Sequence, residues 1–280
     1  MRASQAALVV VATPIGNLGD LSPRAKEALD EADVVVCEDT RRARKLLAHA
    51  GITGKQLVAV QGHNEAAEAR RVMVYLEDGR RVALTTDAGT PGISDPGQRL
   101  VAAAARAGHQ VLVVPGPSAV IAALAVSGLP AQRFVFEGFL PRKGRERSER
   151  LAAVAAERRT LVIYEAPNRV RQTVDDLLAA CGPHRRVALA RELTKLHEEV
   201  WRGNLSDAAE HVGAVEPRGE HVVVVEGAPA EPAASDADIE GALAARMGAG
   251  EDKRAALAAV AAELHVPKRR VYDVALRLGS

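Results

Sequence analysis

The sequence contains few aromatic residues and few cysteines. Phe, Trp and Tyr together make up 2% of the 280 residues, which excludes a surface that binds nucleic acid mainly by stacking bases on aromatic rings. The two cysteines, Cys37 and Cys181, lie far apart, and no CxxC or Cys/His cluster accompanies them. This pattern argues against a structural zinc site and against a disulfide scaffold. We therefore expect a metal-free protein of the reducing cytoplasm.

Neither an excess of one charge nor a long apolar run is present. Lys and Arg number 37 against 36 Asp and Glu, a net charge of +1, so only a local basic face could attract nucleic acid. No apolar stretch reaches the roughly 18 residues that span a bilayer, so the protein is expected to be soluble and without a membrane partner. The apolar run at residues 6–12 is followed by Thr13-Pro14 without a small-residue cleavage pattern, which favours a buried strand over a signal peptide.

Hydrophobic residues make up 48% of the chain, and its length suits about two domains. Five short Val- and Leu-rich runs alternate with helical patterns, and they occupy residues 8–12, 34–37, 57–60, 82–86 and 111–114. Apolar strands joined by helix-length connections predict a parallel sheet that is buried on both faces. Ser22-Pro23 is typical of a helix start, whereas Gly51, Gly79 and Gly108 are typical of helix ends. The sequence thus predicts an α/β domain at residues 1–128.

A smaller α/β domain is predicted at residues 129–228. Its expected strands lie near residues 134–137, 161–165, 187–192, 198–201 and 221–226, and its expected helices near 147–157 and 168–180. The last three strands follow one another closely, which favours a mixed sheet with hairpin pairing. The Ala- and Pro-rich residues 228–235 resemble a linker, and residues 236–280 show only helical patterns.

The residues with chemical potential cluster after the strands of the first domain. Ligands of open parallel sheets bind at the carboxyl ends of the strands, where loop amides and helix N-termini converge. Residues 85–97, TTDAGTPGISDPG, form an unusually long loop, since such loops take about two to six residues. Its glycines would allow close backbone approach to a ligand, and Asp87 or Asp95 could accept hydrogen bonds from it. The absence of GxxxxGK[ST], of GxGxxG after the first strand and of GxSxG argues against a nucleoside triphosphate ligand and against a nucleophilic serine.

Six motifs together resemble a known family. They are TPIGNLGD at 13–20, CEDTR at 37–41, DAGTP at 87–91 with SDPG at 94–97, GPS at 116–118, EGFLP at 137–141 and ARELTK at 190–195. In order and spacing, over residues 7–228, the chain resembles the bacterial small-subunit ribosomal RNA 2′-O-methyltransferases of the tetrapyrrole methylase superfamily. The resemblance implies S-adenosylmethionine as methyl donor, a cleft between two α/β domains, a cytidine 2′-hydroxyl in the decoding centre of 16S ribosomal RNA as acceptor, and a homodimer.

The resemblance also implies which residues contact the cofactor. They are Pro14, Leu18, Asp87, Gly89, Thr90, Ile93, Ser94, Ser118, Ala119, Tyr164 and Glu220. Two positions depart from the family pattern. Gly92 stands where many relatives have a larger apolar residue, and Asn168 stands where relatives often have His.

Methyl transfer to a hydroxyl requires a group that removes the proton. The base candidates are Lys195, Glu192, Glu165, and Glu38 or Asp39, with Arg191 as a neighbouring cation that could depress the pKa of Lys195. A strand that continued through this segment would place Arg191 and Lys195 on one face and Glu192 on the other. For each candidate, an exposed ion pair is the simpler alternative.

Two basic segments are candidate RNA contacts. The first has Arg142, Lys143, Arg145 and Arg147 at a predicted helix start, and the second has Lys268, Arg269 and Arg270 in a helix-turn-helix pattern. A solvated helix start and a packing unit are the respective alternatives. Two other functions stay open: a methyltransferase of the same superfamily that acts on a porphyrinoid, and a ligand-sensing DNA-binding regulator.

Overall fold

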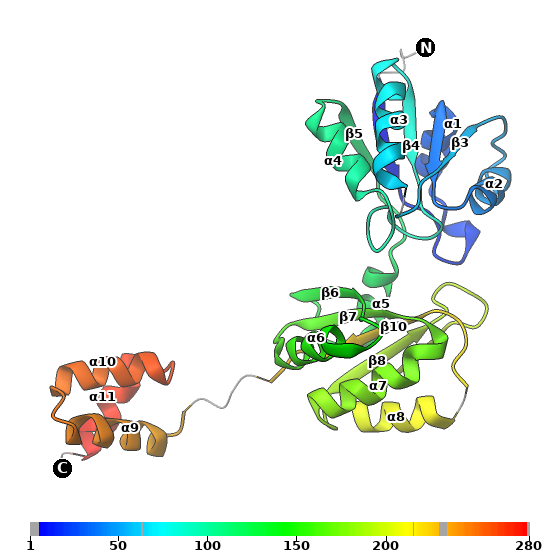
Figure 1. Ribbon diagram of the computed structural model, residues 1–280. Coiled ribbons are helices and arrows are strands. Elements are labelled where there is room, and N and C mark those ends of the chain that lie inside the picture. Colours follow the sequence, from blue (N-terminus) through cyan, green and yellow to red (C-terminus); the bar gives the residue numbers. More distant parts are fainter. Residues whose placement is uncertain (1–5, 63, 215, 230–233, 279–280) are drawn as a thin grey trace. The chain divides into compact units, whose positions relative to one another are not determined.

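We describe residues 6–62, 64–214, 216–229 and 234–278 of a computed structural model of the chain. The chain divides into two compact units, Met1–Ala228 and Pro229–Ser280. The first unit contains two β-sheets with their helices, and the second contains helices (Figure 1). Among the described helices, none is long and apolar enough to cross a bilayer.

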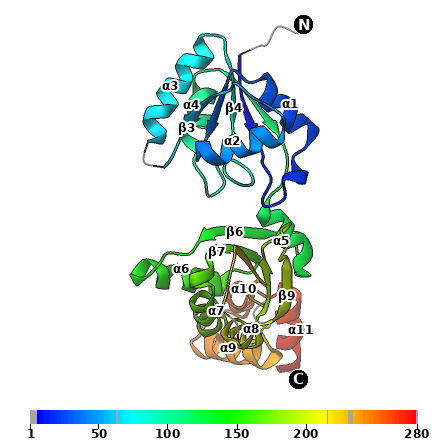
Figure 2. The same ribbon diagram turned by 90° about the vertical axis from the view of Figure 1, so that its right-hand side faces the viewer.

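The first sheet is parallel throughout, with the strand order β3-β2-β4-β1-β5. Its strands are β1 (Ala7–Val11), β2 (Val34–Cys37), β3 (Gln56–Ala59), β4 (Arg81–Leu84) and β5 (Gln110–Val114). Alternate residues of the strands enter two apolar cores, because successive side chains of a strand point to opposite faces. The helices α1 (Pro23–Glu31) and α2 (Thr40–His49) cover one face, and α3 (Glu65–Glu77) and α4 (Gln98–Arg106) cover the other (Figure 2).

The helix boundaries follow the expected signals. The Ser22 hydroxyl accepts a hydrogen bond from the Ala25 amide, and Pro23 occupies the first turn of α1. Gly51, Gly79 and Gly108 follow α2, α3 and α4 with φ angles of 73°, 80° and 79°. This left-handed conformation ends a helix at little steric cost only for glycine.

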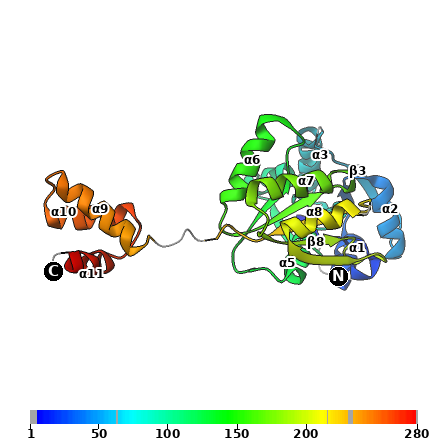
Figure 3. The same ribbon diagram turned by 90° about the horizontal axis from the view of Figure 1, so that it is seen from below.

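The second sheet is mixed, with the strand order β6-β7-β10-β8-β9. It contains β6 (Phe134–Phe139), β7 (Thr160–Glu165), β8 (Arg186–Arg191), β9 (Glu199–Asn204) and β10 (His221–Val225). β6 and β7 are parallel, and the remaining pairs are antiparallel. One face packs against α6 (Gly144–Ala156), α7 (Pro167–Cys181) and α8 (Leu205–Ala214), of which α7 and α8 lie side by side (Figure 3). The helix α8 was not expected from the sequence.

The helix α5 (Ala119–Ser127) covers the opposite face of the second sheet. Its Val120, Ala123 and Leu124 pack against Val222 and Val224 of β10. The helix α5 therefore packs on the second sheet, although the sequence predicted its residues to belong to the domain at 1–128. The two sheets belong to the same compact unit, and the loop after β5 connects them.

The second unit is a three-helix bundle of α9 (Asp236–Gly248), α10 (Lys253–Glu263) and α11 (Lys268–Leu278). Ile239, Leu243, Val260 and Val271 form its apolar core. Ser235 caps α9 through a reciprocal pair of hydrogen bonds with Asp238.

Candidate functional site

A cavity of about 430 Å³ opens at the carboxyl ends of the first sheet. Its lining comes from the loops after β1, β2, β4 and β5, and from the ends of β6, β7 and β10. This volume lies in the range of small-molecule sites. The sequence placed its ligand site at this edge, and the structure has a cavity there.

Nine of the eleven expected cofactor contacts line this cavity: Asp87, Gly89, Thr90, Ile93, Ser94, Ser118, Ala119, Tyr164 and Glu220. The other two do not. Pro14 is buried, and Leu18 lies in the short helix η1 (Leu18–Asp20) with 42% of its surface exposed. The residues that the sequence did not single out include Ile15, Arg42, Phe139 and His221. Ile15 and Phe139 lie within recognised motifs and Arg42 directly follows one, which was the available signal, whereas His221 lies outside all of them.

Two loops are joined at the cavity wall. Thr13 and Gly89 form an isolated antiparallel bridge, in which the Thr13 amide donates to the Gly89 carbonyl at 2.8 Å and the Gly89 amide donates to the Thr13 carbonyl at 3.1 Å. The Thr13 hydroxyl also donates to the Thr86 carbonyl at 3.1 Å. Gly89 has φ +82°, a conformation that favours glycine. The loop 85–97 is therefore held against the loop after β1 by main-chain contacts.

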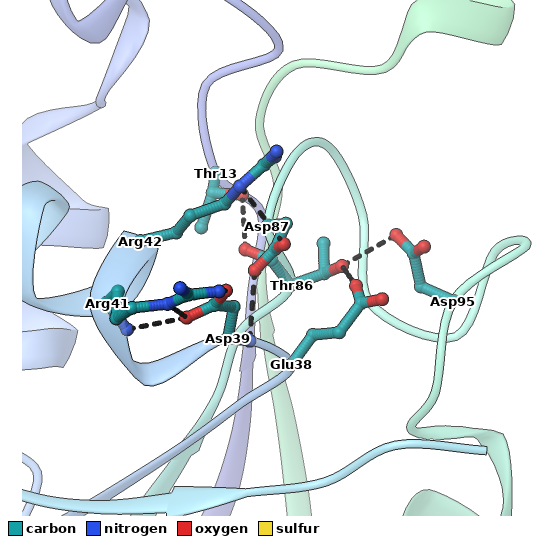
Figure 4. Close-up of polar contacts among 8 residues, drawn as sticks. All are labelled: Thr13, Glu38, Asp39, Arg41, Arg42, Thr86, Asp87 and Asp95. Carbon is teal, nitrogen blue, oxygen red and sulfur yellow. Dashed lines mark hydrogen bonds and ion pairs between the residues drawn. The ribbon is translucent and has the colours of Figure 1, made fainter. Parts of the chain in front are cut away.

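Carboxylates gather on the same wall (Figure 4). The Thr86 hydroxyl donates to Asp95 at 2.6 Å and lies 3.5 Å from Glu38. Burial raises the pKa of Asp95, and the neighbouring Asp87 raises it further. Burial also raises the pKa of Glu38, with added repulsion from Asp95 and Asp87. Such a wall disfavours anions and suits a ligand that carries positive charge.

Asp87 and Asp39 have structural partners. Asp87 accepts a hydrogen bond from the Asp39 amide at 3.1 Å and pairs with Arg42 at 3.4 Å. Asp39 caps α2 and pairs with Arg41 at 2.7 Å, and hydrogen bonds from Arg41 hold the pKa of Asp39 well below its usual range. Asp39 is therefore a poor proton acceptor at neutral pH.

The strand β8 does not continue through residues 192–195. The strand ends at Arg191, and Glu192 and Thr194 have φ angles of 50° and 66°. This turn brings the Lys195 ammonium to 2.8 Å from Glu192 and 2.8 Å from Glu220. The placement of Glu192 and Lys195 on opposite faces required a strand that continued to residue 195, and this condition is not met, because the left-handed residues break the alternation of a strand.

Lys195 is a paired cation in this arrangement. Burial lowers the pKa of Lys195, but its hydrogen bonds with Glu192 and Glu220 outweigh burial and leave the pKa raised. To act as a base, Lys195 would need a depressed pKa, and this arrangement raises it instead; the neighbouring cation Arg191 pairs with Glu199 at 3.1 Å. Lys195, Glu192 and Arg191 do not line the cavity, whereas Glu220 does.

Gly16 makes the contact between the first loop and this segment possible. A Cβ atom at Gly16 would lie 2.4 Å from Cγ of Lys195 and 3.2 Å from the Leu193 carbonyl oxygen. Only a residue without a side chain fits at this distance. The glycine of the TPIGNLGD motif thus has a packing role that the sequence alone did not reveal.

Glu165 lines the cavity and is fully buried. Its carboxylate accepts hydrogen bonds from the Thr173 hydroxyl at 2.6 Å and from the Ala166 amide at 2.9 Å, and it lies 3.4 Å from Arg169. The side chain is fixed in one orientation by these contacts.

Arg147 does not lie on a basic surface as the sequence suggested. It is 5% exposed, and its guanidinium donates to Asp176 at 2.7 Å, to the Pro141 carbonyl at 2.8 Å and to the Thr173 hydroxyl at 3.0 Å. The prediction of an RNA phosphate contact by Arg147 was wrong, because its donors are used internally.

The other predicted RNA contacts are more accessible. Arg142 and Lys143 are exposed, and Arg145 is exposed although it pairs with Glu149 at 2.6 Å. In the helical unit, Lys268 and Arg269 are exposed, whereas Arg270 pairs with Asp236 at 3.0 Å. Part of the charge of Arg270 is therefore neutralised within the bundle.

His221 contributes a further polar group to the cavity. One ring nitrogen, Nε2, lies 3.1 Å from the Arg218 carbonyl, and Nδ1 has no hydrogen-bond partner in the part of the chain that the structure describes. Burial lowers the pKa of His221, so the imidazole is neutral at physiological pH.

Comparisons with known proteins identify the family. The model of the Tetrapyrrole (Corrin/Porphyrin) Methylases matches residues 7–209. The chain belongs to the tetrapyrrole methylase family. It is 44% identical over 273 residues to "Ribosomal RNA small subunit methyltransferase I" of Synechocystis sp., covering 97% of this chain and 98% of that protein. The protein of the same name from Escherichia coli O157:H7 is 43% identical over 276 residues, covering 98% and 96%.

A solved structure supports the fold assignment. The uroporphyrin-III C-methyl transferase of Thermus thermophilus, complexed with S-adenosylhomocysteine, superposes with a TM-score of 0.56 at 23% identity, covering 79% of this chain and 96% of that chain. The predicted α/β fold class and the resemblance to the ribosomal RNA methyltransferase branch of the tetrapyrrole methylase family are thus confirmed. As a member of this family, the protein is a methyltransferase.

The two departures from the family pattern have different positions in this tetrapyrrole methylase. Gly92 has φ +81°, a backbone conformation that favours glycine. Asn168 is exposed in the first turn of α7 and does not line the cavity.

Proposed function

We propose that this protein transfers a methyl group from S-adenosylmethionine to the 2′-hydroxyl of a cytidine ribose in the decoding centre of 16S ribosomal RNA. The observation that carries the cofactor part is the cavity, which combines an acidic wall with glycine-containing loops. The RNA part rests on the relatives, which are named as ribosomal RNA small subunit methyltransferases. We also infer that the protein acts in the cytoplasm as a homodimer.

The residues of the cavity fit the methyl donor, which supplies an activated methyl group on a positively charged sulfur. Glu38, Asp87 and Asp95 favour positive charge there, while Arg42 neutralises part of Asp87. The main chain near Gly89 and the amides at the start of α5 can approach and orient polar groups of a ligand. Apolar contact comes from Ile93 and Tyr164.

Removal of the hydroxyl proton needs a base that reaches the cavity. Glu38 combines a place in the lining with a raised pKa, which brings a carboxylate closer to the range of an effective general base. Glu165 also lines the cavity, but its carboxylate is engaged with Thr173 and Arg169. We therefore assign proton acceptance to Glu38 and the positioning of Glu220 to Lys195 and Glu192.

The RNA would contact basic side chains outside the cavity. Arg142, Lys143 and Arg145 on one segment, and Lys268 and Arg269 on the helical unit, are exposed. Exposed cations of this kind bind phosphates without reading the sequence. Selection of one cytidine would then come from the shape of the RNA around the cavity.

The decisive experiment measures transfer of a tritiated methyl group from S-adenosylmethionine to small ribosomal subunits and to a porphyrinoid, together with the binding of duplex DNA. We expect transfer to small ribosomal subunits that lack this modification, with the label in a 2′-O-methylcytidine after nuclease digestion. Labelling of a porphyrinoid instead would support the alternative substrate class. Labelling of neither, together with tight binding of duplex DNA, would support a regulator.

The base is tested in the same assay by single-turnover rates. Glu38→Gln should reduce transfer about a hundredfold or more while S-adenosylmethionine still binds. Lys195→Met should be less damaging if Lys195 only positions Glu220. A severe loss with Lys195→Met and a near-normal rate with Glu38→Gln would reverse the two roles.

A further inference from the structure

A second concave surface lies between α3 and α4, the two helices that cover one face of the first sheet. These two helices pack against each other, and the groove between them encloses about 440 Å³. Its floor consists of small or flexible apolar side chains: Ala66, Ala69, Met73, Ala102 and Ala103. Arg70, Arg99 and Arg106 stand along it. Because the floor is made mainly of alanines, an extended chain can approach the helices closely.

The groove is positively charged. Arg70, Arg99 and Arg106 are exposed, and within the described residues none of them forms an ion pair. No acidic residue is among the described residues that line the groove. Arg99 and Arg106 are seven residues apart on α4, so they lie on the same side, roughly 10 Å apart along the helix axis. This arrangement forms a row of cations and not a single anion site.

The groove is rigidly built and begins beside the cavity. The buried Glu65 at the start of α3 accepts hydrogen bonds from the Gly97 amide at 3.0 Å and from the Arg99 amide at 2.8 Å. This carboxylate links the first turns of α3 and α4. The helix α4 follows directly after the loop 85–97, whose residues line the cavity. An RNA strand that left the cavity along this side of the sheet would therefore meet Arg99 before Arg70 and Arg106.

We propose that the α3–α4 groove binds the ribose-phosphate backbone of the RNA segment next to the methylated nucleotide. This inference rests on the proposed function, since it assigns a second contact surface to the same substrate. Three unpaired arginines favour a polyanion, because each can neutralise one phosphate. A second copy of the chain is the less favourable occupant. In a two-fold interface this surface would meet itself, which would bring like charges together.

The test compares two triple variants with the same loss of charge. Arg70→Gln, Arg99→Gln and Arg106→Gln neutralise the groove. Arg24→Gln, Lys26→Gln and Lys45→Gln are the matched control, because these exposed cations lie on α1 and α2, which cover the other face of the sheet. Binding to 16S ribosomal RNA is measured across a salt series, together with methyl transfer, S-adenosylmethionine affinity and oligomeric state.

We expect the groove variant to bind RNA about tenfold or more weakly at moderate salt. The slope of its log association constant against log salt should become less negative by about two, since each phosphate contact contributes about 0.7 to 0.9 to the magnitude of that slope. The control should stay close to wild type in both respects, and cofactor affinity should not change in either variant.

Other outcomes overturn the inference. Equal losses in the two variants would mean that net charge and not the groove governs binding. An unchanged salt slope in the groove variant would show that the arginines do not contact RNA. A changed oligomeric state in the groove variant alone would identify a second copy as the occupant. A failure of the proposed function is distinguishable, because the wild-type protein would then methylate no 16S ribosomal RNA. That result would also refute the groove inference.

Discussion

Thr173 connects the cavity with the interior of the second sheet domain. Its side chain is fully buried, and its hydroxyl donates to Glu165 at 2.6 Å while accepting a bond from Arg147 at 3.0 Å. Valine has nearly the same shape as threonine and the same branching at Cβ. The change Thr173→Val therefore removes the hydroxyl while leaving the packing and helix propensity of α7 almost unaltered.

The expected loss of stability follows from these contacts. A hydrogen bond to a charged group contributes about 1.5 to 3 kcal/mol, and the hydroxyl makes two of them. Glu165 keeps the Ala166 amide and Arg169, and Arg147 keeps Asp176, so neither charge is left without a partner. The two hydrogen bonds together contribute about 3 to 6 kcal/mol. We expect a decrease of about 3 kcal/mol in the free energy of unfolding, the lower end of this range, because both charged groups keep other partners.

The assay is urea denaturation followed by the fluorescence of Trp201, the single tryptophan of the chain. Trp201 packs against the core that contains α7, so its signal reports this part of the protein. Thr173→Ser is the control, because it keeps the hydroxyl and loses one methyl group, at about 1 kcal/mol. If Thr173→Val is as stable as Thr173→Ser, the hydroxyl bridge does not stabilise the fold and the argument fails.

Three further changes test other features. Gly89→Val should weaken S-adenosylmethionine binding in calorimetry while the fold survives, because φ +82° at Gly89 strains any residue with a side chain and would distort the loop that lines the cavity. Gly54→Val is the control, since Gly54 has a similar φ of +72° but open space around it. Asp95→Asn should raise the melting temperature at pH 7, with a gain that vanishes below about pH 4. A raised pKa means that the charged carboxyl destabilises the folded protein as the pH rises; a gain that grows on acidification would contradict this. Deletion of the chain after Pro229 should leave the unit Met1–Ala228 folded with unchanged cofactor affinity but weaker RNA binding; aggregation, or unchanged binding, would make the helical unit a packing element.

The strands were predictable because their signal is local. Val34–Cys37 consists of three valines and a cysteine, and all four residues are buried. Such a run fits a strand covered on both faces whatever surrounds it. The helix α8 lacked a comparable signal. It spans only ten residues and starts directly after β9 at Leu205, so no separate turn marks its beginning.

The carboxyl ends of the first sheet could also be predicted as the site, since parallel topology brings distant loops to one edge. The lining from the second sheet was harder to obtain. Tyr164 and Glu220 were named only through the family resemblance, and His221 was not named at all. Tyr164 and His221 belong to strands, and Glu220 is exposed just before a strand. Nothing in these sequence positions indicates a cavity until the two sheets are placed.

Charge alone could not separate Arg147 from its neighbours. Arg145 and Arg147 are two residues apart in one basic run, yet Arg145 is exposed and Arg147 is buried. On a helix, positions two apart point in different directions, and only one of them faced α7, which carries Asp176 and Thr173. A buried guanidinium requires partners in fixed places, and two of these partners, Asp176 and Thr173, are 29 and 26 positions away. Lys195 also depends on a residue that is distant in sequence, because it pairs with Glu220, 25 residues further along the chain. Its position depends in addition on a turn at Glu192 that contains no glycine, so the sequence carried no signal for that turn.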